Sequence, residues 1–141
     1  LMFRKKYEDR LLEWSRFRDT LETSQTPFQD VISYYKDAPS VTLNADPWDR
    51  TTWPNPWELL LENEYCDFTR VLGWCYSLQL TDRFKGSSFE IHIITDEEKS
   101  YIYVLKVDNF LLGFYENEVT ELSQMSEKFH SQEACPMPNL Q

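Results

Sequence analysis

A cysteine, a histidine and an aspartate follow one another along the chain in an order that suits thiol chemistry: Cys66, His92 and Asp108. A nucleophilic thiolate needs an imidazole to accept its proton and a carboxylate to orient that imidazole. His92 lies in an extended pattern, and Asp108 ends the next one. Cys66, His92 and Asp108 are therefore the candidate residues for such chemistry, if the fold brings them together. The alternative for His92 is a hydrogen-bonded or solvated strand histidine.

The element that must position Cys66 is the longest periodic segment, residues 55 to 80. Asn55 and Glu58 form a capping-box pattern, and the apolar residues that follow have the spacing of one helical face. A continuous helix would leave Cys66 in its middle, beyond the first turn in which the helix dipole lowers a thiol pKa. The pattern thus favours an inert helical thiol. A catalytic Cys66 would require a break near residues 62 to 64, which no glycine or proline marks.

The other elements are two amphipathic helices before this segment and three strands after it. They are expected at about residues 3–21 and 27–38 for the helices, and 89–94, 101–107 and 110–115 for the strands. Consecutive strands joined by short turns imply an antiparallel meander with one face on the helices. We therefore predict a single α+β domain over residues 1–141, with an ordered core over about 3–122 and a loosely held tail over 123–141.

The charge balance limits the classes of partner. The 141 residues include 14 Lys and Arg against 24 Asp and Glu, for a net charge of −10. Such a surface favours solubility, disfavours binding to a nucleic-acid backbone and suits a basic protein partner. Three cysteines without paired spacing fit a reducing compartment, and no apolar run has the length of a membrane span. We expect a cytoplasmic protein.

The segment from residue 40 to 54 is the candidate binding loop. It contains Trp48 and Trp53 and no glycine, which is typical of an ordered loop rather than a flexible linker. The two indoles would either anchor the loop in the core or form a surface on which a ligand stacks. The strand expected at 110 to 115 carries few charges, so its edge could pair with a second copy of the chain.

Other chemistries lack their motifs. The three cysteines and two histidines show no metal-binding spacing, so no metal site is predicted. The Glu97-Glu98-Lys99 run has the letters of a nuclease motif but falls in a predicted turn. With only three glycines there is little room for a phosphate cradle, and we predict no cofactor. Cys75 is expected in the core, and Cys135 exposed in the tail.

Parts of the chain resemble two groups of known proteins. The run from Glu64 to Phe68 (EYCDF) resembles the glycine-x-cysteine-x-aspartate-phenylalanine segment of bacterial transglutaminase-like proteins. This resemblance implies a thiol hydrolase or acyl-transferase in which Cys66 is the nucleophile, His92 the base and Asp108 the group that orients the base. Residues 49–60 (DRTTWPNPWELL), 65–68 (YCDF) and 78–84 (LQLTDRF) look like segments of small uncharacterised proteins of T4-like marine cyanophages. This resemblance covers about residues 45 to 115, and it implies a phage setting and the host cytoplasm but no activity.

Two functions are therefore predicted as alternatives. The preferred one is a non-enzymatic protein that acts by protein–protein contact, with its acidic surface and tryptophan-bearing loop as contact elements. The other is a transglutaminase-like or papain-like thiol enzyme. They differ in whether the chain breaks before Cys66 and whether His92 comes within hydrogen-bond reach of it.

Overall fold

The computed structural model describes residues 2–95, 98, 100–114, 118–124 and 131–141. Within these residues, four α-helices and a five-stranded antiparallel sheet form an α+β fold, which confirms the predicted class. The helices are α1 (Tyr7–Leu21), α2 (Pro27–Tyr35), α3 (Pro56–Glu62) and α4 (Asp67–Gln79). The strands are β1 (Phe89–Thr95), β2 (Tyr101–Val107), β3 (Phe110–Leu112), β4 (Val119–Glu121) and β5 (Ser131–Pro136). No helix among the described residues is both long and apolar enough to cross a membrane.

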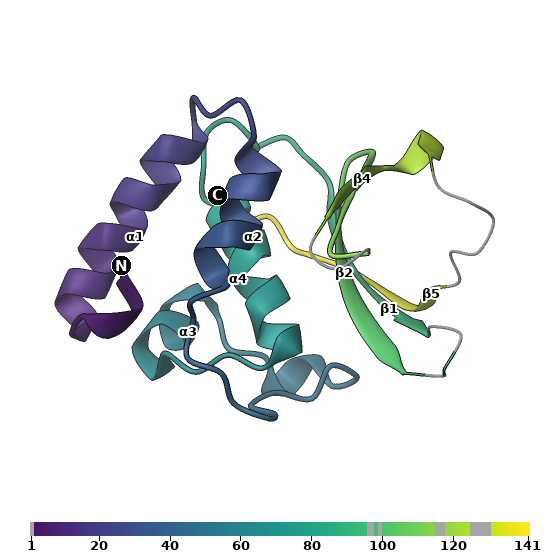
Figure 1. Cartoon of the computed structure of the whole chain (residues 1–141), viewed down its shortest axis with the longest axis horizontal. Coiled ribbons are helices and arrows are strands. Elements are labelled where there is room, and N and C mark those ends of the chain that lie inside the picture. The colour runs from purple at the N-terminus through teal and green to yellow at the C-terminus, as the bar shows by residue number, and fades with distance from the viewer. Residues whose placement is uncertain (1, 96–97, 99, 115–117, 125–130) are drawn as a thin grey trace.

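Helix α4 is the element against which the rest of the fold packs. It lies between the other helices and the sheet (Figure 1), and it contacts α1, α2 and α3 as well as β1 and β2. Every residue from Val71 to Gln79 is buried. Burial on all sides is expected of a helix in the centre of a small domain. The helix therefore supplies the centre of the core.

Two close contacts join α4 to the helices beside it. At Gly73, a Cβ atom would lie 2.5 Å from Cε1 of Tyr35, so only glycine lets α2 approach this closely. One turn further on, the Ser77 hydroxyl lies 2.9 Å from the Trp14 indole nitrogen, which donates to it, and 3.0 Å from the Tyr35 hydroxyl. Buried polar groups need such partners. The three residues thus satisfy one another inside the helical layer.

The single long helix predicted for residues 55 to 80 is wrong. The segment forms two helices, α3 and α4, because the chain turns through a left-handed residue, Asn63, with φ of 54°. Asparagine adopts this conformation more readily than other residues with a Cβ. The predicted start is correct, since the Asn55 and Glu58 side chains form a capping box at α3.

The sheet is larger than the predicted three-stranded meander. Its strand order is β4-β3-β2-β1-β5, with β5 pairing antiparallel to β1. The expectation of a loosely held tail is therefore wrong for residues 131 to 136, and residues 125 to 130 lie outside the described part of the chain. The strand expected at 110 to 115 is not a sheet edge, because β3 pairs with both β2 and β4. Tyr115 and part of the predicted turn at 95 to 100 also lie outside the described residues.

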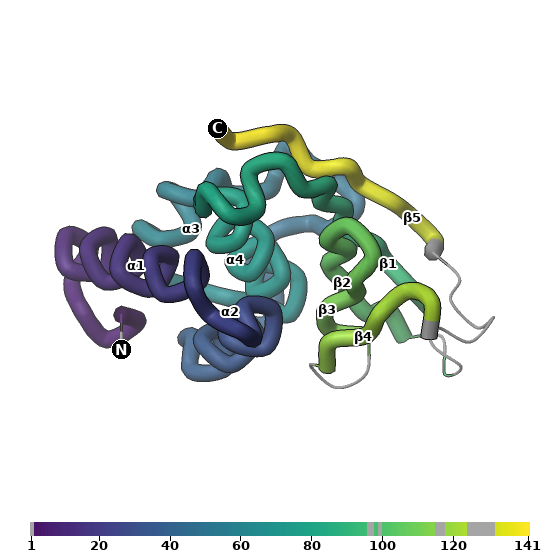
Figure 2. Tube along the Cα trace, turned by 90° about the horizontal axis from the view of Figure 1, so that it is seen from above, coloured from purple at the N-terminus to yellow at the C-terminus, as the bar shows by residue number. Residues whose placement is uncertain are grey.

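The segment after β5 runs back from the sheet towards the end of α4, as Figure 2 shows. The Gln79 side chain donates to the Pro138 carbonyl over 2.9 Å. In return, the Gln141 side chain donates to the carbonyls of Gln79, over 2.6 Å, and of Thr81, over 2.7 Å. These bonds attach the segment after the last strand to the central helix.

Candidate functional site

The break between α3 and α4 has two supports outside the helices. Asn63 ends α3, and its side-chain amide donates to the Phe3 carbonyl over 2.9 Å. Two residues on, the Tyr65 amide donates to the Pro39 carbonyl, and the Val41 amide donates to the Tyr65 carbonyl. The backbone groups of this segment therefore bond to the 39–41 loop instead of continuing a helix.

Cys66 is the N-cap residue of α4, not a mid-helix residue. Its amide donates to the Thr69 hydroxyl over 2.9 Å, and its Sγ accepts from the Thr69 amide at 3.5 Å. The Thr69 hydroxyl in turn lies 2.9 Å from Oδ1 of Asn44, which belongs to the 40–54 loop. The chain therefore breaks before Cys66 and places its thiol at a helix N-terminus, as a catalytic Cys66 would require. The hydrogen-bond partners of the thiol are a hydroxyl and backbone amides.

Opposing effects act on the Cys66 thiol. Burial acts to raise its pKa, because the thiolate loses water. Hydrogen bonds from the Thr69 side chain and from the backbone oppose this and bring the pKa below its ordinary value. The side chain itself is almost completely enclosed, with 2% of the residue exposed. A substrate would have no access to the sulfur in this conformation.

His92 is not brought to Cys66. Its neighbour Ile91 belongs to the main core with Cys66 and α4, and side chains alternate between the two faces of a strand. His92 instead faces the same side as its cross-strand partner Val104, which packs in a separate apolar cluster. The sheet therefore stands between the imidazole and the thiol.

The carboxylate beside His92 is Glu90, not Asp108. Nε2 of His92 lies 3.5 Å from Oε2 of Glu90, and Lys106 Nζ lies 3.4 Å from the other oxygen. Burial lowers the pKa of His92 below its ordinary value, Glu90 acts to raise it, and Lys106 acts to lower it. Asp108 lies four residues beyond Val104, the partner of His92, or about 13 Å along an extended strand.

Asp108 has a structural role at the other end of the β1–β2 pair. Its φ is 50°, and it makes a reciprocal contact with Ser88. The Asp108 amide donates to the Ser88 carbonyl over 3.0 Å, and the Asp108 carboxylate accepts from the Ser88 amide at 2.9 Å. The three residues of the predicted triad thus lie in three separate places.

The two tryptophans of the 40–54 loop differ in their surroundings. Trp53 is partly buried against Phe68, with ring centroids 4.9 Å apart, and its indole N–H donates to the Asp46 carbonyl over 2.8 Å. It anchors the loop. Trp48 is 48% exposed and meets the ring of Tyr101 edge to face at 5.5 Å. Tyr101, at the start of β2, is itself 54% exposed.

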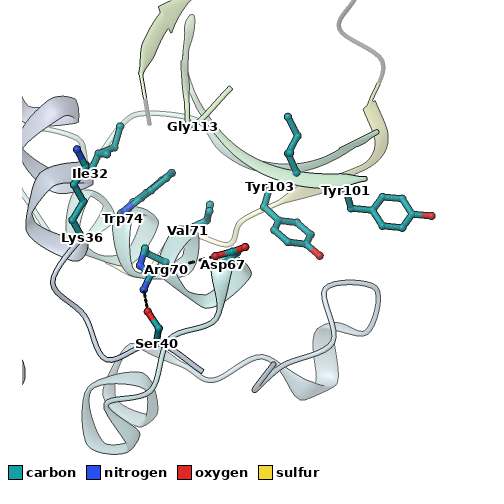
Figure 3. A pocket seen from close by; sticks show the side chains of 11 residues that line it. Ile32, Lys36, Ser40, Asp67, Arg70, Val71, Trp74, Tyr101, Tyr103 and Gly113 are labelled. Carbon is teal, nitrogen blue, oxygen red and sulfur yellow. Dashed lines mark hydrogen bonds and ion pairs between the residues drawn. The ribbon is translucent and has the colours of Figure 1, made fainter. Parts of the chain in front are cut away.

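Beside Tyr101 lies a groove of about 460 Å³ between the α2–α4 pair and the strands β2 and β3. Figure 3 shows Tyr101 and Tyr103 projecting from β2 on the sheet side of the groove, with Asp67 and Arg70 on α4 opposite. The Asp67 side chain is 94% exposed, whereas that of Arg70 is 17% exposed and donates to the Tyr35 carbonyl. Arg70 Nη1 also lies 3.6 Å from Asp67 Oδ1, and the exposed Lys36 lines the groove as well. Asp67 is thus the more exposed member of an ion pair.

The pKa of Tyr103 is affected by the same acidic side chains. Partial burial raises the pKa of its hydroxyl, and the negative charges of Cys66, Asp67 and Asp46 raise it further. Sequence reasoning singled out Trp48 but missed Tyr101. The available signal was the Tyr-x-Tyr alternation at the start of β2, which puts both phenol rings on one face of the sheet. We call Trp48, Tyr101, Asp46 and Asp67 the acidic aromatic surface.

Comparisons of the chain with models of protein families, with curated proteins and with solved structures found no match. The resemblances to transglutaminase-like proteins and to cyanophage proteins remain predictions. Among the described residues, no three His, Cys, Asp or Glu side chains gather in a way that could hold a metal ion. Glu97 and Lys99 of the nuclease-like run lie outside the described residues.

Proposed function

We propose that this chain is a non-enzymatic protein that acts by binding a basic protein through its acidic aromatic surface. The observation that carries the proposal is the contact between Trp48 and Tyr101, two large aromatic side chains that are each about half exposed and meet edge to face at 5.5 Å. Single exposed apolar residues are ordinary on protein surfaces. A preformed pair of Trp and Tyr rings is instead typical of the centres of protein interfaces.

The charges around these rings favour a cationic partner. Asp46 and Asp67 are exposed, and the net charge of the whole chain is −10. A lysine or arginine side chain that lies over an indole or phenol ring gains a cation–π interaction, and neighbouring carboxylates add to it. The arginine nearest to Asp67 is already bonded to backbone carbonyls of its own chain. Arg70 Nη1 also lies 3.6 Å from Oδ1 of Asp67, whose side chain is 94% exposed. A basic side chain of a partner would therefore meet Asp46 and an Asp67 carboxylate that is only partly compensated by its own arginine.

The thiol-enzyme alternative receives less support from the same structure. Cys66 lies at a helix N-terminus, as that alternative requires. Its hydrogen bonds, however, are those of a helix cap, and the side chain of His92 faces the other side of the sheet. A proton acceptor for the thiol would have to come from elsewhere.

The proposal is tested by affinity capture with three forms of the immobilised chain. These are the wild type, the double variant Trp48→Ala/Tyr101→Ala, and the control Leu12→Ala, which removes an apolar side chain of similar exposure (50%) from α1. A partner retained by the wild type and the control, and lost from the double variant, is then purified and titrated. We expect the partner to bind the double variant at least about tenfold more weakly than the wild type. We also expect its affinity for the wild type to fall as the salt concentration rises.

Equal binding to the wild type and the double variant would overturn the proposal. Loss of binding from the control as well as from the double variant would also contradict it, since the effect would then not be specific to the acidic aromatic surface. Far-ultraviolet circular dichroism of each variant checks whether the fold is retained.

A further inference from the structure

A second groove, of about 570 Å³, lies on a different part of the molecule, between the start of α2, the loop after α4, and the strands β3 and β4. Three partly exposed rings line it: Phe28, Phe84 and Phe110. The Phe28 ring lies 5.4 Å from that of Phe84 and 5.2 Å from that of Phe110. With Val119 they form what we call the phenylalanine groove. It shares no lining residue with the acidic aromatic surface.

The groove borders a sheet edge. Strand β4 ends the strand order, so within the described residues no strand pairs with its outer side. The Leu122 amide donates to the Asn109 carbonyl, and the Gly113 amide donates to the Glu118 carbonyl. These two bonds show which pairs of residues in β3 and β4 are hydrogen-bonded to each other and which lie between bonded pairs. Residues between bonded pairs point their backbone groups away from the neighbouring strand. The N–H and C=O groups of Val119 and Glu121 are therefore directed outward.

The phenylalanine groove lies on the helix side of the sheet, next to the edge formed by β4. Val119 pairs with Leu112, and both pack with the main core on the helix side of the sheet. Directly opposed residues share one face of a sheet. A strand added beside β4 would thus carry every second side chain on the face where the phenylalanine groove lies.

The charges near β4 favour a basic partner over a second copy of this chain. Glu118 and Glu121, on and next to β4, and Asp108, which also lines the groove, are exposed. Arg83 is tied down, because its side chain donates to the carbonyls of Leu21 and Ser24. Pairing of β4 with β4 of a second copy would bring like charges together, which is destabilising. A segment that carries lysine or arginine would complement them.

We propose that an extended, basic segment of a partner protein pairs with the outer edge of β4 and inserts an aromatic or large aliphatic side chain into the phenylalanine groove. Backbone hydrogen bonds supply affinity in this mode of recognition, and the pocket for alternate side chains supplies specificity. The site is separate from the acidic aromatic surface, and a partner could occupy both.

The test uses the full chain and a defined probe, the capped heptapeptide Lys-Val-Lys-Phe-Lys-Val-Lys. Its apolar side chains share one face when extended. Titration into isotope-labelled protein is expected to shift the backbone NMR signals of Val119 to Glu121 and the ring signals of Phe28, Phe84 and Phe110. The same peptide, N-methylated at the alternate amides that would face β4, is expected to bind at least about tenfold more weakly, because it lacks the donors of the ladder.

Two variants at one position separate the backbone from the side chain. Glu121→Pro removes an outward N–H that β3 does not use, a substitution that edge strands tolerate. Glu121→Ala removes only the carboxylate. We expect the proline variant to lose binding about tenfold relative to the alanine variant. Val119→Asp, which places a charge at the rim of the groove, is expected to abolish binding.

Three outcomes would overturn the inference: equal binding of the N-methylated peptide, equal binding to the two Glu121 variants, or shifts confined to the acidic aromatic surface. The Trp48→Ala/Tyr101→Ala variant keeps the two proposals apart. Peptide binding at β4 should be unchanged in it, whereas capture of a partner through the acidic aromatic surface should be lost.

Discussion

Cys66 and Thr69 exchange hydrogen bonds across the first turn of α4, with the Cys66 amide 2.9 Å from the Thr69 hydroxyl and the Thr69 amide 3.5 Å from Cys66 Sγ. A helix cap needs an acceptor at this position, and a serine hydroxyl accepts at least as well as a thiol. We expect Cys66→Ser to keep the free energy of unfolding of the wild type, and Cys66→Ala to lower it by about 1 kcal/mol. Urea denaturation followed by tryptophan fluorescence measures both. An alanine variant as stable as the wild type would remove the capping role.

Alkylation of Cys66 by iodoacetamide tests whether His92 activates the thiol. The protein carries Cys75→Ala and Cys135→Ala, so that only one thiol reacts. Because the Cys66 sulfur is enclosed in the folded protein, we expect slow alkylation in both forms. Because the sheet lies between the two residues, we expect His92→Gln to leave the pH dependence of that slow rate unchanged. A rise in the apparent thiol pKa on removal of the imidazole would instead support the thiol-enzyme alternative.

Gly73→Ala is expected to destabilise the protein although alanine favours helices. The added Cβ would lie 2.5 Å from Cε1 and 2.8 Å from Cζ of Tyr35. The Tyr35 ring is buried and its hydroxyl contacts Ser77, so it cannot move without breaking that contact. Overpacking of this kind costs about 1–3 kcal/mol, more than the gain of about 1 kcal/mol in helix propensity. Thermal unfolding of the variant measures the net effect, and a raised melting temperature would contradict the expectation.

The left-handed conformation of Asn63 predicts an order among its variants. Glycine adopts a positive φ without strain, whereas alanine does not. Both lose the hydrogen bond to the Phe3 carbonyl. We therefore expect Asn63→Ala to be less stable than Asn63→Gly by about 1 kcal/mol, measured by denaturant unfolding. Equal stabilities would mean that α3 and α4 are not separated by a left-handed residue.

The buried imidazole of His92 predicts a loss of stability in acid. Its pKa is lowered in the folded protein, chiefly by burial, so the unfolded chain binds a proton more readily. The folded state therefore loses stability as the pH falls below the ordinary histidine value of about 6.5, and regains it above that value. His92→Gln should flatten this dependence between about pH 7 and 5. Glu90 and Lys106, which contact each other there, are unchanged in the comparison. An unaltered pH profile would contradict the prediction.

Local signals predicted the starts of α2 and α3 but missed the end of α3 and the start of α4. The Asn55 capping box and the proline after it were readable because they use the residues most common at such sites. The break at Asn63 was missed because only glycine and proline were considered as breakers. Cys66 was equally hard to recognise as a cap, since a thiol is a weaker acceptor than the usual hydroxyl or carboxylate. The break also depends on backbone bonds between residue 65 and the 39–41 loop, and such long-range contacts leave no local pattern in the sequence.

The candidate sites depended still more on long-range contacts. The alternating pattern of β1 correctly identified His92 as a strand residue, but the face of that strand was fixed only by how the sheet packs on α4. The pairing of Trp48 with Tyr101 joins segments far apart in the chain, and no local pattern announces it. Strand β5 was missed because its polar composition (SQEACP) lacks the apolar alternation of a half-buried strand.

The pairing of β5 with β1 also bears on how the chain folds. Strands β2, β3 and β4 each pair with the strand that precedes them in the sequence, so those contacts close short loops. The pairing of Cys135 in β5 with Ile91 in β1 instead closes a loop that contains the other three strands. Non-local pairings form late because the entropy of loop closure must be paid before they contribute. A chain in which β5 has not yet paired would leave the outer edge of β1 open, and an open strand edge is a place where another chain can pair.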